Sequence, residues 1–132
     1  MTIAYWCVLA VILMPYVWFG FFAGRVGAAR DNNQPRAVMA SAEGPALRAL
    51  GAHQNSFEAS IGFIAAVIIA SLAHAPQGRI DLLALIFVAA RIAYGALYLA
   101  GLGALRSLAF FVGLLCTIGL FVISAMAGGA AG

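Results

Sequence analysis

The sequence contains no lysine and little charge of either sign. Only 8% of its 132 residues are charged, 65% are hydrophobic, and the mean hydropathy is +1.06. A soluble domain carries about 25% charged residues, so a water-soluble fold of this composition would lack a polar surface. The composition therefore indicates an integral membrane protein and excludes a large soluble site.

Cysteine is equally scarce. Cys7 and Cys116 both lie inside apolar runs, and they resemble neither a set of metal ligands nor a redox pair. We interpret them as small buried hydrophobic residues and expect no metal site.

The net charge of +3 would suggest nucleic-acid binding in a soluble protein. Here most of the charge lies at membrane edges, where it reports topology, so no nucleic-acid partner is expected.

Four apolar runs are long enough to cross a bilayer, which takes about 20 residues in a helix. The predicted spans are about 3–24, 45–73, 80–102 and 107–126. They use most of the chain, so we expect residues 1–132 to form a single all-α domain, a four-helix transmembrane bundle. The first run has no positive charge before it, unlike a secretory signal peptide, and is therefore interpreted as a retained span.

The arginines are distributed unevenly between the two ends of this predicted bundle. The connection between the second and third spans holds one, Arg79, and the termini hold none. The other two connections hold five: Arg25, Arg30, Arg36, Arg48 and Arg106. Because positive residues stay in the cytoplasm, the long loop is predicted to be cytoplasmic and both termini to lie on the opposite side.

One arginine falls inside a span. Arg91 lies about eleven residues, or roughly 16 Å, from either end of the third span, where a charge costs at least about 2.5–3.5 kcal/mol. It should therefore face protein and pair with another group. Glu58 is the acid that falls inside another span, so we expect an Arg91–Glu58 pair, within one subunit or across two.

The spacing of the polar residues predicts one polar stripe on each of two neighbouring helices. Arg48, Asn55 and Glu58 stand at offsets 0, 7 and 10 on the second span, which places them on one face. The third span carries a similar stripe with offsets 0, 3 and 7, formed by Arg91, Tyr94 and Tyr98. Together the stripes predict a charged crevice that opens toward the cytoplasm.

The crevice favours a small zwitterionic or polyanionic ligand, of which glutathione is one example. Arg106 and Ser107 begin the fourth span at the same face, and a helix N-terminus with an Arg favours an anion. His53 is adjacent to the stripe but points elsewhere, and His74 is interpreted as a loop residue. The alternative interpretation of the stripes is structural, because polar pairs also hold membrane helices together.

At these residues the chain resembles the MAPEG family, the membrane-associated proteins of eicosanoid and glutathione metabolism. The resemblance covers nearly the whole chain. Its specific elements are Asn-x-x-Glu, here Asn55 to Glu58, and Arg-x-x-Tyr-x-x-x-Tyr, here Arg91 to Tyr98, followed by Arg106. Both elements occur in order on the second and third of four predicted spans.

The resemblance implies a homotrimer in a lipid bilayer, with glutathione bound as co-substrate between neighbouring subunits near the cytoplasmic face. It also implies a microsomal-type glutathione transferase or peroxidase that acts on small lipophilic electrophiles. The peptide would be held by five residues, namely Asn55, Glu58, Arg91, Tyr94 and Tyr98. Arg106 would stabilise the thiolate, and Arg30 and Arg48 would supplement the carboxylate contacts.

The chain is most similar to the short bacterial branch of the family, which implies a bacterial inner membrane with periplasmic termini. Well-studied eukaryotic members often have an Arg four residues before the Asn, where this chain has Gly51, and some have Tyr after the Glu, where this chain has Ala59. Two other hypotheses stay open. One is a non-catalytic membrane assembly of the same fold, and the other is a small transporter that uses the Arg–Glu pair as a relay.

Overall fold

A computed structural model describes residues 1–27 and 31–130 of the chain. Within these residues five helices follow one another: α1 (Ile3–Val26), α2 (Pro35–Ala40), α3 (Gly44–Leu72), α4 (Gln77–Ala100) and α5 (Gly103–Ala130). All except α2 are long and apolar enough to cross a membrane. The expected all-α membrane bundle with four spans is therefore confirmed.

Local sequence signals set the ends of these helices. Thr2 caps α1 by accepting a hydrogen bond from the backbone N–H of Tyr5 at 3.3 Å, and a proline opens the first turn of α3. Helix α4 ends at Gly101, which adopts the left-handed conformation with φ of 75° and so suits glycine. The short turn after it starts α5 at once.

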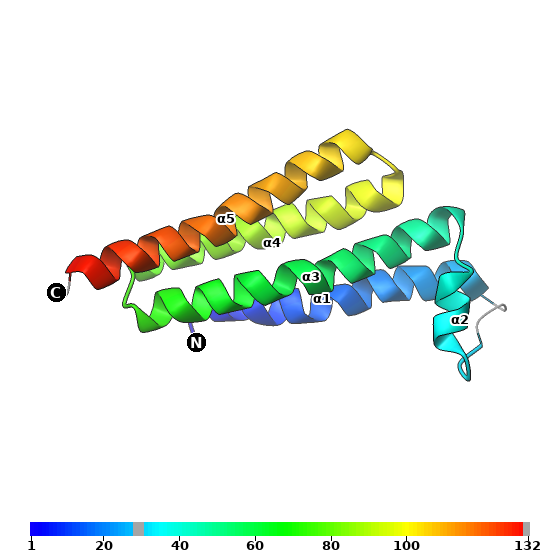
Figure 1. Cartoon of the computed structure of the whole chain (residues 1–132), viewed down its shortest axis with the longest axis horizontal. Coiled ribbons are helices and arrows are strands. Elements are labelled where there is room, and N and C mark those ends of the chain that lie inside the picture. Colours follow the sequence, from blue (N-terminus) through cyan, green and yellow to red (C-terminus); the bar gives the residue numbers. More distant parts are fainter. Residues whose placement is uncertain (28–30, 131–132) are drawn as a thin grey trace.

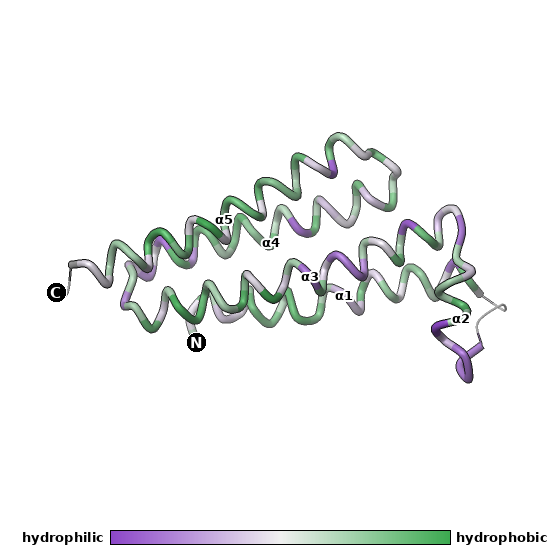
Figure 2. The backbone as a smooth tube through the Cα atoms, in the orientation of Figure 1, coloured by the Kyte–Doolittle hydropathy of each residue, from purple (hydrophilic) through white to green (hydrophobic). Residues whose placement is uncertain are grey.

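The long helices form two antiparallel pairs. Helix α1 packs mainly on α3, and α4 packs mainly on α5. The pairs lie close together near the chain termini and diverge toward the end that carries the α4–α5 turn and α2 (Figure 1). Hydrophilic residues gather on α2 and on the neighbouring half of α3, whereas the rest of the tube is largely hydrophobic (Figure 2).

Two contacts join the pairs away from the diverging end. Phe63 of α3 stacks on Phe87 of α4 with ring centroids 4.0 Å apart, and both side chains are at most 2% exposed. Nearer the termini, the backbone N–H of Ala4 donates to the Asp81 carboxylate at 2.9 Å. This carboxylate therefore satisfies one of the free N–H groups at the start of α1 and ties it to α4.

Some helix bounds differ from the predicted spans. Helix α5 begins at Gly103 rather than near residue 107 and continues to Ala130, because hydropathy marks the apolar stretch and not the backbone hydrogen bonding beyond it. Arg106 consequently lies within the first turn of α5 instead of before it. Helix α2 arises within the segment predicted as the long loop, with Pro35 at its first position.

The Phe63–Phe87 stack gives a direct test of this packing. Replacing the fully buried Phe63 with Ala should destabilise the protein by about 3 kcal/mol, because the cavity left behind loses its packing contacts. Phe111→Ala is the matched control, since Phe111 is 58% exposed. Thermal unfolding in detergent should show a large decrease in Tm for the first variant only. Equal decreases would contradict this packing.

Candidate functional site

The guanidinium of Arg91 lies at the centre of the candidate site. The side chain is 2% exposed, and its Nη2 donates to Oδ1 of Asn55 on α3 at 2.7 Å. Its Cζ lies 4.1 Å from the centroid of the Tyr94 ring, one turn further along α4. The charge is thus received by an amide oxygen and an aromatic face, the type of partner that a desolvated cation requires.

Asn55 connects Arg91 to Glu58. Its Nδ2 donates to Oε2 of Glu58 at 3.2 Å while its Oδ1 accepts from Arg91. Among the described residues of this protomer, Arg91 and Glu58 therefore do not form the expected direct pair. The side-chain amide of Asn55 lies between the two charges instead. Glu58 itself is exposed on the protomer surface, which leaves its carboxylate accessible.

Two tyrosines and Arg106 extend this polar chain toward the end of the bundle. The rings of Tyr94 and Tyr98 meet edge to face with centroids 5.7 Å apart. The guanidinium of Arg106, from the first turn of α5, lies 4.3 Å from the centroid of the Tyr98 ring. The sequence-predicted stripes of α3 and α4 thus come together, and Arg106 joins them from α5.

Arg48 has a different position from the one expected. Its Nε donates to the backbone oxygen of Leu99 at 3.2 Å, near the C-terminus of α4, where carbonyl groups lack helical partners. In this structure Arg48 therefore binds the end of a helix, whereas a contact with a ligand carboxylate was expected. Arg30 lies outside the described residues.

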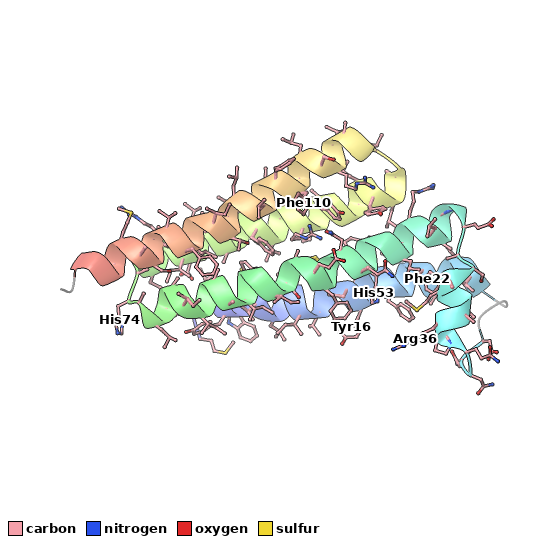
Figure 3. All side chains as sticks on the ribbon, viewed as in Figure 1. Tyr16, Phe22, Arg36, His53, His74 and Phe110 are labelled. Carbon is pink, nitrogen blue, oxygen red and sulfur yellow. The ribbon has the colours of Figure 1, made fainter. Side chains whose placement is uncertain are left out.

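A groove of about 310 Å³ lies beside Arg91. Its floor is α4, where Phe87 and Arg91 are each 2% exposed. Helices α3 and α5 form its two walls, and Figure 3 labels Phe110 of the α5 wall. The residues that line it are Asn55, Glu58, Ala59, Gly62, Phe87, Arg91, Phe110, Gly113, Leu114 and Thr117. The lining is therefore mostly apolar, with the polar side chains of Asn55, Glu58 and Arg91 contributed by α3 and α4.

The residues of the α5 wall were missed from the sequence. Phe110, Leu114 and Thr117 follow Arg106 at offsets 4, 8 and 11, which is one face of a helix. That spacing was available as a signal, but an apolar stripe in a membrane span has the same appearance whether it faces lipid, protein or a ligand.

His53 lies on the other side of α3. Its Nδ1 is 2.8 Å from the backbone oxygen of Pro15 in α1, and its ring packs 5.1 Å from that of Phe19. Figure 3 shows it beside α1, away from Phe110. His53 is therefore a contact between α1 and α3, as its position off the polar stripe indicated. Cys7 and Cys116 are buried free thiols of the core.

The model of the MAPEG family matches residues 3–126. The chain belongs to the MAPEG family. No curated protein and no solved structure matched it. Because MAPEG proteins include glutathione transferases and non-catalytic members, membership establishes the membrane bundle but leaves the activity to be argued from the site.

The structure explains why this MAPEG chain carries glycine at position 51. A Cβ placed on Gly51 would overlap the hydroxyl end of the Tyr98 ring. An Arg, which eukaryotic members often have here, would need Tyr98 to move, and Tyr98 in turn contacts Arg106. Gly51 therefore permits the close approach of α3 to the tyrosine that supports Arg106.

A pair of glycine substitutions on α3 tests this fit. Ala ordinarily stabilises a helix interior by about 1 kcal/mol relative to Gly. Gly62→Ala should stabilise the protein in this way, because the new Cβ would meet only Thr117 Cγ2, at an ordinary contact distance of 3.7 Å. Gly51→Ala should instead lower the Tm in detergent, since it displaces Tyr98. If both variants raised the Tm, the proposed close contact at Gly51 would be absent.

Proposed function

We propose that this MAPEG protein binds glutathione and conjugates it through its sulfur to small lipophilic electrophiles, or uses it to reduce lipid hydroperoxides. The observation that carries the proposal is the Arg91–Asn55–Glu58 chain, which lines a groove in an otherwise apolar bundle. Charged side chains at membrane depth are energetically unfavourable in the bilayer. The binding of a polar ligand would explain why they are present there.

The groups around the groove suit the chemistry of this peptide. Glutathione carries two carboxylates, an α-amine, amides and a thiol. The exposed carboxylate of Glu58 is suited to the amine, and the N–H groups of Arg91 not directed at Asn55 are suited to a carboxylate. Tyr94 and Tyr98 offer phenols at the same site. Arg30 and Arg48 are proposed for the remaining carboxylate contacts, which would require Arg48 to leave Leu99.

Arg106 is proposed as the residue that stabilises the thiolate. A free thiol has a pKa of about 8.5 and is mostly protonated at neutral pH. Arg106 lies in the first turn of α5, so its guanidinium and the positive end of the helix act together on an anion. The proton would leave to solvent, and the thiolate sulfur would form a C–S bond at the electrophilic carbon while the leaving group on that carbon departs with the electron pair of the bond that breaks.

We further propose that the protein is a homotrimer with glutathione between subunits. Glu58 stands at the middle of α3 (Gly44–Leu72) and is exposed in the single protomer. An ionised carboxylate facing hydrocarbon is strongly unfavourable. Coverage of this face by a neighbouring subunit and its ligand removes that cost.

We propose a bacterial inner membrane location from the resemblance to the short bacterial branch, and the arginine distribution supports an orientation with the α2 end in the cytoplasm and both termini in the periplasm. Ser41 on the α2 side and Gly78 in the first turn of α4 are both exposed. In intact cells, Gly78→Cys should react with a membrane-impermeant maleimide, and Ser41→Cys should react only after permeabilisation, since the buried native thiols are protected. The reverse pattern would invert the orientation.

A non-catalytic assembly is the second candidate, and one contact favours it. The Arg91–Asn55 hydrogen bond ties α4 to α3, which is sufficient reason for a buried polar pair in a membrane bundle. This alternative predicts an intact fold with no response to glutathione.

Glutathione-dependent thermal stabilisation in detergent separates the two candidates. A ligand at 100 times its Kd stabilises the native state by about 2.7 kcal/mol, so millimolar glutathione should raise the Tm clearly. Glu58→Gln keeps the shape of the side chain but removes its charge, and should reduce the shift. No shift in the unmodified protein would support the non-catalytic assembly.

A second measurement addresses Arg106 alone. Arg106→Leu should abolish the ultraviolet absorbance of bound glutathione thiolate at neutral pH, because the nearby positive charge is lost, while glutathione still raises the Tm. Arg79→Leu, at the opposite end of the bundle, is the matched control and should retain the signal. An unchanged thiolate signal in Arg106→Leu would remove this residue from the proposed role.

A further inference from the structure

Two bulky side chains bridge the helix pairs in the half of the bundle where the pairs diverge (Figure 1). Trp18 of α1 lies against Gly95 of α4, where an added Cβ would overlap the six-membered ring of the indole. In the opposite direction, the Tyr98 ring of α4 ends at Gly51 of α3. Each ring therefore meets a glycine of the other pair, which allows a close approach of the ring to the backbone.

The two contacts share one buried cluster. Tyr98 packs on a cluster that contains Trp18 and Ala52, and Trp18 is 7% exposed. Gly95 is itself buried and precedes Tyr98 by three residues, which is less than one turn of α4. The Trp18 ring therefore limits how closely this part of α4 approaches α1, and with it where Tyr98 lies.

The shape of the indole, and not a hydrogen bond, explains why a tryptophan is present at position 18. Among the described residues, Nε1 of Trp18 is the buried side-chain polar atom that has no hydrogen-bond partner, and a buried N–H without an acceptor is unfavourable. A phenylalanine would avoid this N–H, but it would not reach Gly95. The indole atoms nearest to the Gly95 Cβ position are Cζ2, Cε2 and Cη2, which belong to the outer, six-membered ring.

Tyr98 connects this contact to the proposed thiolate site. The guanidinium of Arg106 lies 4.3 Å from the centroid of the Tyr98 ring. If the ring moves, the aromatic face against which the guanidinium lies moves with it. Trp18 does not line the groove, but only Tyr98 separates it from Arg106.

We propose that Trp18 is a positioning residue for the thiolate site. Its ring sets the spacing of α1 and α4 at Gly95 and thereby holds Tyr98 against the Arg106 guanidinium. This inference rests on the proposed function and adds to it a residue of α1 that lies outside the groove. A change at Trp18 should therefore alter the thiolate, whereas the Arg91–Asn55–Glu58 chain should still bind the peptide.

The pH dependence of the bound thiolate tests this inference. In Trp18→Phe, the midpoint of the ultraviolet thiolate titration of bound glutathione should rise by about one pH unit toward that of the free thiol, because a more distant cation stabilises the thiolate less. Removal of the unpartnered N–H offsets part of the lost packing, so the variant should fold, and glutathione should still raise its Tm. Trp6→Phe is the matched control, since Trp6 of the same helix is 58% exposed, and should keep the midpoint.

A second substitution should restore the spacing, which a general loss of stability would not allow. Gly95→Ala alone should also raise the midpoint, because its Cβ displaces the indole. In the double variant Trp18→Phe/Gly95→Ala, the new Cβ fills the space that the outer ring has left. The midpoint should then return most of the way to that of the unmodified protein, a coupling expected of residues in contact.

An unchanged midpoint in Trp18→Phe, or midpoint shifts that simply add in the double variant, would overturn the inference. Either result would leave the proposed function standing, provided that glutathione raises the Tm of the unmodified protein. A Tm shift without a thiolate signal in the unmodified protein would refute the thiolate role of Arg106 and this inference with it. Absence of the Tm shift would refute the proposed function itself.

Discussion

The rest of the site depends on how the buried guanidinium of Arg91 is accommodated. A charge in the middle of a membrane helix is tolerated only where protein groups replace water. Here the amide of Asn55 accepts its hydrogen bond and the face of Tyr94 lies against it. The hydrogen bond to Asn55 ties α3 to α4, and Asn55 in turn donates to Glu58, which lines the groove.

The arrangement of the helices follows from where polar and apolar contacts fall along them. Near the termini, the Phe63–Phe87 stack and the Asp81 carboxylate hold the two helix pairs together. Toward the other end the pairs diverge (Figure 1), and arginines and tyrosines replace the small apolar residues. The groove lies at this transition, so polar and apolar side chains both line it.

The structure also accounts for position 51, at which this chain differs from well-studied eukaryotic MAPEG proteins. The end of the Tyr98 ring occupies the space that a side chain at position 51 would need. The residue at position 51 therefore determines where this ring, which contacts Arg106, can lie. Arg48, one turn earlier on α3, binds the end of α4 at Leu99. An arginine in this region therefore need not serve a ligand.

The sequence alone determined the membrane class, the four spans, the arginine-rich end and the two polar stripes. These properties are local, because hydropathy and the 3.6-residue period depend only on residues near one another in the chain. The tertiary structure alone decided that Arg91 meets Asn55 before Glu58, that Arg48 caps α4, and that Phe87 and Phe110 face one groove. Each of these depends on the rotation and axial offset of one helix against another, and such offsets arise from packing across the whole bundle.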